Sequence, residues 1–452
     1  MVWKKNSKGL ARQDSSLNQI NIKYRCPLRG EIICPPDKSI SHRAIMLSSL
    51  AKGKSIIKNF LRAEDPMRTL GAFKQMGINI TLKTHDKDAQ TYKNEVIING
   101  RGLTGLIEPA GTIDCGNSGT TMRLLSGVLA GQAFSSQLSG DSSLKSRPMQ
   151  RIITPLSKMG AIISSERNGY PPLKIKGGSL RPISYSSPVA SAQVKSAILL
   201  AGLYCDGITT VIEPGQSRDH TERMLMACGA DINVKNATVT VRGMNPLNAI
   251  DVTIPGDLSS AAYFIVAGLL VPESEILVRD TGVNPTRSGV IDILNRMGAD
   301  IRLENIREVS GELVADILVK YSKLKGIDIK ADEILRAIDE FPILCTAAST
   351  AEGPTRITGA KELRVKESDR IASMASELIK MGAAIEELED GLVIEGTEEL
   401  QAASVNSHGD HRIAMSLAIA GLTARGQTTI SDTDCVNTSF PEFMTLIEGL
   451  QH

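Results

Sequence analysis

The stretch PPDKSISHRAIMLSSLA, from Pro35 to Ala51, sets a pattern that the chain repeats. A polar or Gly/Pro-rich opening leads into a run of small apolar residues, and a Thr/Ile-rich stretch follows. Five further openings are DCGNSGTTMR from Asp114, SPVASAQVK from Ser187, IPGDLSSAA from Ile254, AIDEFPILC from Ala337 and SHGDHRIAM from Ser407. Each indicates a helix start, where unpaired backbone N–H groups and the positive end of the dipole favour anions. Six such starts meeting in one place would form a site for polyanions.

A second recurring element is a Met-Gly or Cys-Gly step. It stands in KQMGINI, SKMGAII, MACGADI, NRMGADI and IKMGAAI, with glycines at Gly77, Gly160, Gly229, Gly298 and Gly382. Glycine just past a helix, after Lys or Arg, is typical of a helix C-terminus. A strand-like stretch follows each step, and a second strand often ends at Gly. The sequence therefore predicts an α/β fold of six βαβαββ units, three in each of two lobes.

Composition narrows the class of protein. The chain has 452 residues, 42% hydrophobic but only 3% aromatic, and a net charge of +1. That charge argues against a partner that is a nucleic acid or a membrane surface, and no apolar run is long enough to span a membrane. Seven dispersed cysteines and six histidines favour a reduced, cytoplasmic protein without a metal site. We expect residues 1–20 to be a loose polar leader and the chain to be a monomer.

Six units divide naturally into three plus three. We expect residues 35–250 to form the first lobe, and residues 251–452 together with 21–34 to form the second. The last unit lacks its closing strand pair, which the N-terminal segment from Asn21 could supply. The chain would then cross between the lobes twice, leaving a cleft that is a favoured place for a ligand.

The openings carry an unusual stock of cations beside Gly, Ser, Thr or Asn: Lys38, Arg43, Arg123, Arg147, Arg218, Lys366, Arg370 and Arg412. Arginine grips carboxylates and phosphates at two points. Pro148 excludes Arg147 from helical geometry and predicts a loop arginine. RVKESDR, from Arg364, predicts Lys366 and Arg370 four apart on one helix face, although a solvated, salt-bridged helix would look the same. Asp339, at the start of an apolar run, is a cap or a base.

Taken together, these motifs resemble a known family. DKSISHR, GNSGTTMR, SLKSRPM, SAQVKSA, SRDHTE, AIDEFP, RVKESDR, DHRIAM and TSFPEF stand in the order found in 3-phosphoshikimate 1-carboxyvinyltransferases, the EPSP synthases. The resemblance runs from about Cys34 to Phe443. It implies two inside-out α/β barrel-like lobes around buried helices. It also implies transfer of the enolpyruvyl group of phosphoenolpyruvate to the 5-hydroxyl of shikimate 3-phosphate, by addition and elimination, without a metal or organic cofactor.

The resemblance also implies roles for individual residues. The implied shikimate 3-phosphate contacts are Lys38, Ser39, Arg43, Ser191, Ala192, Gln193 and Arg218. The implied phosphoenolpyruvate clamp comprises Gly119, Arg147, Arg370 and Arg412, with Lys38 also reaching this substrate. Further implied substrate contacts are Asn117, Arg123, Asp339 and Lys366. Asp339 resembles the carboxylate that takes the 5-hydroxyl proton. Lys366 and Glu367 resemble the groups that handle the proton on the enol methylene, and Lys38 is a further catalytic candidate.

Two departures and two alternatives accompany this interpretation. Thr438 or Ser439 stands where some members carry Lys, and Arg218 and Asp219 occupy a region where some carry Tyr. Gly119 is Ala in part of the divergent branch, so we expect sensitivity to glyphosate. One alternative is the sister enzyme acting on UDP-N-acetylglucosamine, whose nucleophilic Cys loop is missing here. The other is a non-catalytic scaffold that binds phosphorylated ligands and would need neither Asp339 nor Glu367.

Overall fold

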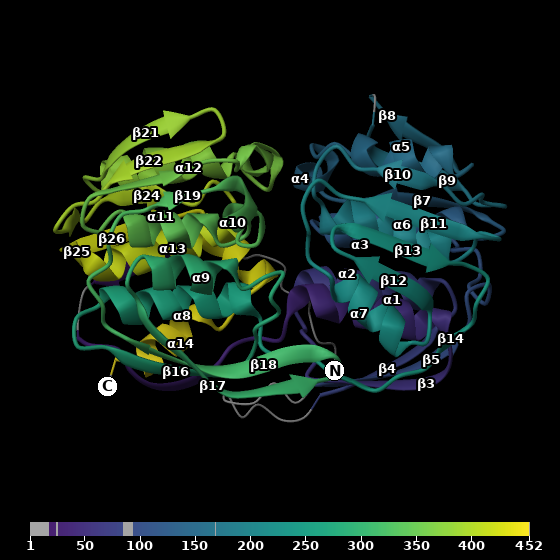
Figure 1. Cartoon of the computed structure of the whole chain (residues 1–452), viewed down its shortest axis with the longest axis horizontal. Helices are drawn as coiled ribbons and strands as arrows, with labels where there is room; N and C mark the ends of the chain where they lie inside the picture. Colours follow the sequence, from purple (N-terminus) through teal and green to yellow (C-terminus); the bar gives the residue numbers. More distant parts are fainter. Residues whose placement is uncertain (1–17, 24–25, 85–93, 168, 452) are drawn as a thin grey trace, which may run out of the picture.

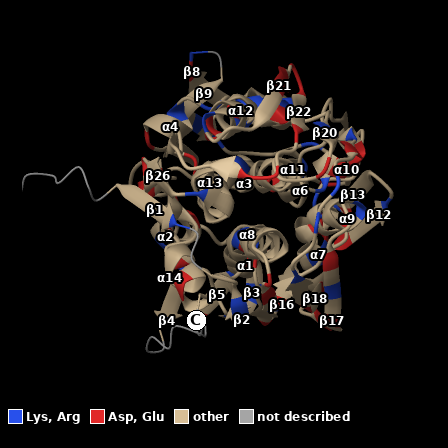
Figure 2. Cartoon of the chain, turned by 90° about the vertical axis from the view of Figure 1, so that its left-hand side faces the viewer, with Lys and Arg blue, Asp and Glu red and all other residues tan. Residues whose placement is uncertain are grey.

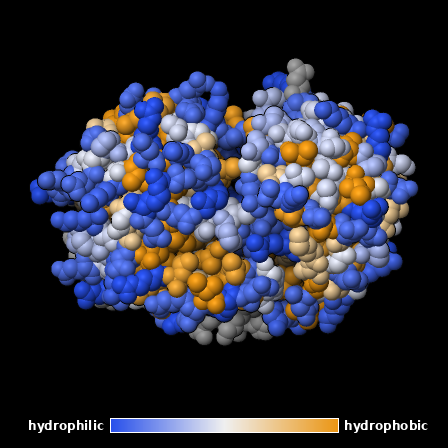
Figure 3. Space-filling model, viewed as in Figure 1, coloured by the Kyte–Doolittle hydropathy of each residue, from blue (hydrophilic) through white to orange (hydrophobic). Residues whose placement is uncertain are grey.

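The computed structural model describes residues 18–23, 26–84, 94–167 and 169–451, which form two lobes side by side (Figure 1). The first lobe is built on one hydrophobic core, from Ile40 to Ile254. The second is built on another, which combines Ile22–Cys34 with Leu258–Leu450. On the face seen in Figure 3 the surface is hollowed between the lobes.

The six openings all lead into helices that are buried through most of their length. They are α1 (Lys38–Leu50), α3 (Gly119–Ala130), α6 (Ala192–Gly202), α8 (Leu258–Leu270), α11 (Phe341–Ala348) and α13 (His411–Thr423). Small apolar residues on every side make a helix that must be buried all round. Thus α1, α3 and α6 form the centre of the first lobe, and α8, α11 and α13 form the centre of the second.

The predicted helix ends are confirmed. The five glycines of the Met-Gly and Cys-Gly steps all have positive φ, between 78° and 104°, just past a helix. These outer helices are α2 (Glu64–Gln75), α5 (Gln150–Lys158), α7 (His220–Ala227), α9 (Gly289–Arg296) and α12 (Arg370–Lys380). Shorter helices are α4 (Ser142–Lys145), α10 (Ala331–Leu335), α14 (Phe443–Gly449) and the 3₁₀ turns η1 (Lys361–Val365) and η2 (Thr433–Thr438).

Twisted sheets cover the helices of the first lobe. Each pairs a parallel edge strand with antiparallel neighbours. In the first sheet, β14 (Leu247–Asn248) and β15 (Val252–Thr253) lie beside β3 (Ala51–Lys58), followed by β5 (Glu95–Arg101) and β4 (Asn79–Lys83). The second sheet has the spatial order β6 (Ile113–Asp114), β7 (Ser135–Ser139), β9 (Tyr170–Lys176) and β8 (Ile162–Glu166). The third has the order β10 (Ser184–Ser186), β11 (Ile208–Ile212), β13 (Thr238–Arg242) and β12 (Asp231–Lys235).

The second lobe uses the same pairing. Its first sheet has the spatial order β2 (Arg29–Ile33), β16 (Glu275–Gly282), β18 (Glu312–Lys320) and β17 (Asp300–Val309), and its second has the order β19 (Asp328–Ile329), β20 (Pro354–Ile357), β22 (Gly391–Glu395) and β21 (Ala384–Leu388). The third sheet consists of β24 (Ser404–Asn406), β26 (Gln427–Ser431) and β1 (Gln19–Lys23). A separate pair is formed by β23 (Leu400–Gln401) and β25 (Ala424–Arg425). Charges of both signs are interspersed over this lobe's outer side (Figure 2), in keeping with the net charge of +1. Among the residues described, no helix is long and apolar enough to cross a membrane.

The N-terminal strands do not act as the expected closing pair. β1 joins β26 in antiparallel fashion, but β2 runs parallel to β16 in a different sheet. Pro27, between the two, has no N–H for a ladder hydrogen bond and separates the strands. β1 begins at Gln19, so the end of the expected leader lies in a strand, and residues 1–17 lie outside the described residues.

The two crossings between the lobes pair with each other. The Asp37 N–H donates to the Pro255 carbonyl, and the Asp257 N–H donates to the Pro35 carbonyl, both at 2.8 Å. Asp37 and Asp257 then cap α1 and α8, one in each lobe. The guanidinium of Arg287, only 3% exposed, contacts both carboxylates. The crossing is therefore a short, buried, charge-paired junction.

Candidate active site

The start of α1 holds two of the predicted substrate contacts, Lys38 and Ser39. Asp37 accepts a hydrogen bond from the Ile40 N–H (2.8 Å), so Lys38 and Ser39 stand in the first turn. The Lys38 ammonium lies 3.3 Å from the Asp65 carboxylate on α2. A cation at the positive end of a helix is unfavourable without an anion beside it, so this position suits a ligand phosphate.

Arg43 lies one turn further along α1 and is buried. Its Nη1 donates to the Ser39 carbonyl (3.0 Å), its Nε donates to the Thr221 hydroxyl (2.6 Å), and its Nη2 donates to the Ser196 hydroxyl (3.0 Å). Burial lowers the pKa of Arg43 to about 10, which still leaves it charged at neutral pH. Its charge is thus fixed in place beside Ser39.

The Gly-rich loop before α3 is held by Arg147. This side chain donates to the Asn117 carbonyl (3.2 Å) and to the Asn117 side-chain oxygen (2.5 Å). Arg147 lies in a loop directly before Pro148, as predicted. A side-chain carbon built on Gly119 would lie 2.8 Å from Nη1 of Arg123, so glycine keeps the space in front of both arginines open.

The start of α6 lies beside the same loop. Ser191 caps this helix, Ala192 is its first residue, and Gln193 follows. Gln193 accepts from Nη1 of Arg123 (2.6 Å) and donates to the Thr120 hydroxyl (3.0 Å). The amide of Gln193 therefore couples the α3 and α6 starts, and Ser191 and Ala192 lie next to that coupling.

In the second lobe, the charges are organised around Arg370, the first residue of α12. Its side chain is 1% exposed and contacts the carboxylates of Asp410 (2.8 Å), Glu367 (2.7 Å) and Asp339 (3.3 Å). Asp410 also accepts from the Arg412 N–H (2.9 Å) as the cap of α13. Arg370 and Arg412 are thereby fixed by one buried aspartate.

The prediction that Lys366 and Arg370 share one helix face is wrong. The turn η1 ends at Val365, and Lys366 has ψ −147°, outside helical geometry. Asp369 then starts a new helix by accepting from the Ala372 N–H (3.1 Å), which makes Arg370 the first helical residue. A capping Asp inside the motif breaks the helix that the charge spacing indicated.

Asp339 is the place where cations from both lobes converge. Its carboxylate lies 2.6 Å from Arg218 of the first lobe, and 3.3 Å and 3.5 Å from Arg370 and Arg412 of the second. Burial alone would raise the pKa of Asp339, but Arg218, Arg412 and Lys366 hold it well below its usual range. Asp339 is therefore an ionised carboxylate at neutral pH.

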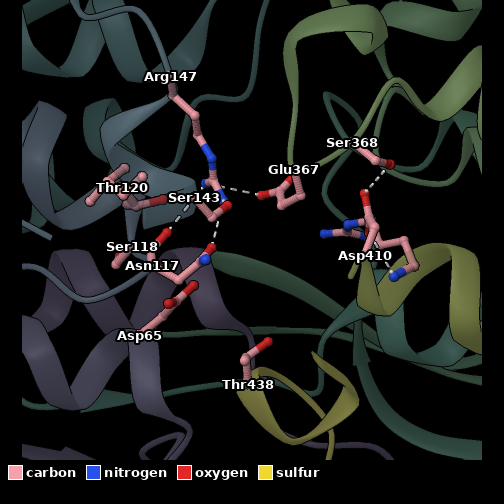
Figure 4. Close-up of polar contacts among 12 residues, drawn as sticks. Asp65, Asn117, Ser118, Thr120, Ser143, Arg147, Glu367, Ser368, Asp410 and Thr438 are labelled. Atoms are coloured by element: carbon pink, nitrogen blue, oxygen red, sulfur yellow. Dashed lines mark hydrogen bonds and ion pairs between the residues drawn. The ribbon is translucent and has the colours of Figure 1, made fainter. Parts of the chain in front are cut away.

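Glu367 forms a second link across the cleft. It lies 3.5 Å from Arg147 of the first lobe (Figure 4). It also lies 2.7 Å from Arg370. These cations hold the pKa of Glu367 well below its usual range, against the effect of burial. Burial lowers the pKa of the neighbouring Lys366, although Asp339 opposes the shift. An ionised carboxylate and an amine that gives up its proton more easily thus stand side by side.

Comparisons with known proteins agree with this geometry. The family model described as EPSP synthase (3-phosphoshikimate 1-carboxyvinyltransferase) matches residues 22–447. The chain is 56% identical to the 3-phosphoshikimate 1-carboxyvinyltransferase of Geotalea daltonii, over 94% of this chain and 97% of that one. It is also 56% identical to that of Thermodesulfovibrio yellowstonii, over 96% and 100%. The chain belongs to the EPSP synthase family.

A solved structure extends the likeness to three dimensions. An EPSP synthase from Acinetobacter baumannii superposes with a TM-score of 0.84 at 46% identity, covering 96% of this chain and 98% of that one. As a member of the EPSP synthase family, this α/β protein transfers the enolpyruvyl group of phosphoenolpyruvate to shikimate 3-phosphate in the shikimate pathway.

Four residues of this EPSP synthase site were not singled out from the sequence. Asp65 pairs with Lys38 but stands in no motif. Asp410 was visible as the polar residue before the run HRIAM, a position typical of a cap. Arg151 and Glu362 form an ion pair of 2.8 Å between the lobes, and no local pattern brings them together.

The two departures from other EPSP synthases differ in their surroundings. Arg218 lies in the cleft against Asp339, and the next residue, Asp219, accepts from Asn284 of the second lobe (2.7 Å). Thr438 ends η2, where its hydroxyl donates to the Cys435 carbonyl (2.7 Å). The region that holds Tyr in some members is therefore an ion-paired part of the cleft here.

Proposed function

We propose that the cleft between the lobes holds both substrates and performs the transfer by addition and elimination. The observation that carries this proposal is the position of Asp339, an ionised carboxylate within 3.5 Å of arginines from both lobes. Arriving phosphate and carboxylate groups would take over these cations and free Asp339 to act as a base.

Shikimate 3-phosphate is bound by the first lobe and by Asp339. The contacts proposed are Lys38, Ser39, Arg43, Ser191, Ala192, Gln193 and Arg218, with Asp339 at the 5-hydroxyl. Two helix starts and three cations of this group match a dianionic phosphate. The fixed guanidinium of Arg43, held by three hydrogen bonds, supports its place in this set.

Phosphoenolpyruvate is bound between the lobes. We assign its phosphate and carboxylate to Lys38, Asn117, Gly119, Arg123, Arg147, Lys366, Arg370 and Arg412. Arg147 and Arg370 already share Glu367 as a partner, and an anionic substrate would compete for both. Positioning two polyanions together is the larger part of the catalytic task.

The chemistry needs one proton moved in each direction. The 5-hydroxyl oxygen adds to C2 of phosphoenolpyruvate as Asp339 takes its proton, and the methylene carbon gains a proton from the ammonium of Lys366. The ionised Glu367, or the neutral amine left on Lys366, then removes a proton from the new methyl group as phosphate leaves with the electrons of its C–O bond. The lowered pKa of Lys366 makes its ammonium a better proton donor than that of an ordinary lysine.

The proposal also covers the repeat architecture, the oligomeric state, the cofactor requirement and the cellular compartment. The repeated pairing of one parallel and then antiparallel strands supports six related units, arranged as two inside-out barrels over residues 35–250 and over 21–34 with 251–452. We propose a cytoplasmic monomer that needs no cofactor. Seven unpaired cysteines support a reducing compartment.

The test is phosphate release from phosphoenolpyruvate and shikimate 3-phosphate by the purified chain and by Asp339→Asn. We expect prompt release by the parent and, in the variant, loss of turnover with shikimate 3-phosphate still bound. Release only with UDP-N-acetylglucosamine would move the assignment to the sister enzyme. Binding without turnover by the parent would support the scaffold interpretation.

A further inference from the structure

The first lobe contains a charged network that takes no part in the proposed chemistry. Lys195 lies one turn into α6 and is 2% exposed. Its ammonium contacts Glu213 (2.9 Å), Glu222 (2.7 Å) and the Ser217 carbonyl (3.2 Å). Both glutamate side chains are at most 2% exposed. Three ionisable groups are thus enclosed beside a core made mostly of aliphatic residues.

Through Glu213, the network holds two segments of the substrate site. One carboxylate oxygen of Glu213 accepts from the Ser191 N–H (2.7 Å), and the Ser217 hydroxyl donates to both oxygens (2.9 and 2.7 Å). Ser191 starts α6, and Ser217 directly precedes Arg218. Lys195 and Glu213 therefore fix the helix start and the loop that carry two proposed contacts to shikimate 3-phosphate.

Through Glu222, the same ammonium reaches a third contact. Glu222 adjoins Thr221, whose hydroxyl accepts from Nε of Arg43 and lies 2.6 Å from the Ser196 hydroxyl. The negative charge of Glu222 also opposes the effect of burial on the pKa of Arg43. Ser191, Arg218 and Arg43 thus share one buried cation as their common support.

An arrangement of this kind has no clear advantage for stability alone. A buried ion pair commonly stabilises a fold no better than apolar residues of similar volume. Its attachments to backbone and hydroxyl groups do restrict geometry, because each bond constrains a specific atom. Three separate segments of the site converge on Lys195, and this points to positioning.

We infer that Lys195 is a positioning residue for shikimate 3-phosphate, acting through Glu213 and Glu222 on Ser191, Arg218 and Arg43. The inference rests on the proposed function. It concerns only the substrate that these three residues hold. Phosphoenolpyruvate, assigned to residues that the network does not touch, should bind as before once shikimate 3-phosphate is saturating.

The experiment measures the KM of each substrate at saturation of the other, and the Kd of shikimate 3-phosphate alone. In Lys195→Met we expect the KM and Kd for shikimate 3-phosphate to rise roughly tenfold, with the KM for phosphoenolpyruvate changed less than about twofold. Since Lys195→Met leaves two buried glutamates unpaired, a second variant, Lys195→Met/Glu213→Gln/Glu222→Gln, removes all three charges. We expect the same selective loss from it.

The matched control is Ile198→Ala, one turn along α6 and fully buried. It should lower the melting temperature without separating the two KM values. Equal rises in both KM values in the triple variant, or none in either, would overturn the inference. Failure of the parent chain to turn over the two substrates would instead overturn the proposed function, so the two failures are distinguishable.

Discussion

The arginines around Asp339 keep its carboxylate ionised, which is the form that a general base requires. Arg218, Arg370 and Arg412 surround it, so the charge that it needs for catalysis is stabilised before a substrate arrives. The arginines that stabilise this charge are also those proposed to bind substrate, and binding would therefore raise the basicity of Asp339 when it is needed.

The depressed pKa of Asp339 gives a pH dependence of stability with a definite sign. A carboxylate whose folded pKa lies below its unfolded value contributes stability above the unfolded pKa, about 4, and loses it as the pH falls toward the folded pKa. We expect Asp339→Asn to melt below the parent by a constant margin from pH 8 to about pH 5. Thermal melts in matched buffers should show that margin narrowing only below about pH 4. A margin that narrows near pH 6 would contradict the assigned pKa direction.

Arg147 gives a prediction that separates the two substrates. Its contacts include Asn117 and Glu367, both in the proposed phosphoenolpyruvate region, as well as the Ser143 hydroxyl. Arg147→Ala should weaken phosphoenolpyruvate by about 2–4 kcal/mol, the range for a lost charged hydrogen bond, and shikimate 3-phosphate by much less. Steady-state KM values for each substrate provide the measurement, and equal losses would undo the assignment.

Gly119 bears on the response to glyphosate. A methyl group there would crowd Nη1 of Arg123, 2.8 Å away, and narrow the space before Arg147. We expect glyphosate at submillimolar concentration to inhibit the parent in competition with phosphoenolpyruvate, and Gly119→Ala to require more of it. Full activity of the parent under those conditions would refute this expectation.

At the scale of elements, the helix starts and ends follow from local chemistry, and their pairing does not. The capping residues and the five positive-φ glycines are properties of a few neighbouring residues, so the sequence predicts them. The strand β2 and the segment Lys366–Asp369 were predicted wrongly. The position of β2 depends on its partner strand β16, which lies far along the chain. The segment Lys366–Asp369 is not helical because Asp369 caps α12 and overrides the charge pattern.

Arg287 links two helices, because its guanidinium pairs with both Asp37 and Asp257, the residues that cap α1 and α8. Replacing it with Met leaves Asp37 and Asp257 buried and unpaired, and we expect a loss of about 3–5 kcal/mol in the free energy of unfolding. Arg296→Met, which breaks an exposed pair with Glu333, is the control and should cost less than about 1 kcal/mol. Urea titrations of both variants would measure the difference, and similar losses would show that the junction is not important for stability.

At the scale of the whole molecule, the site exists only when the lobes meet. Arg218–Asp339, Arg147–Glu367 and Arg151–Glu362 each join one lobe to the other. The sequence indicates the cations and the family, and hence most of the residues proposed for the site. Local patterns carry no information about which residues face each other across a cleft or between two helices of one lobe, so the Arg151–Glu362 pair and the Lys38–Asp65 pair could not be found.

Closure of the cleft should be measurable. With both substrates bound, their charges bridge the lobes, so we expect X-ray scattering to report a smaller radius of gyration than without them. Arg151→Ala removes a contact outside the proposed substrate contacts and should expand the substrate-free protein while leaving the bound form compact. Unchanged scattering on addition of both substrates would count against closure.

The placement of β1 and β2 has a consequence for synthesis on the ribosome. These strands precede the first lobe in the sequence, whereas their partners β16 and β26 follow it. The first lobe is continuous and can complete its core while the two early strands wait with open edges, a state prone to misassociation. The strand β1 therefore has no partner until β26 has left the exit tunnel, whereas β2 can pair as soon as β16 has emerged.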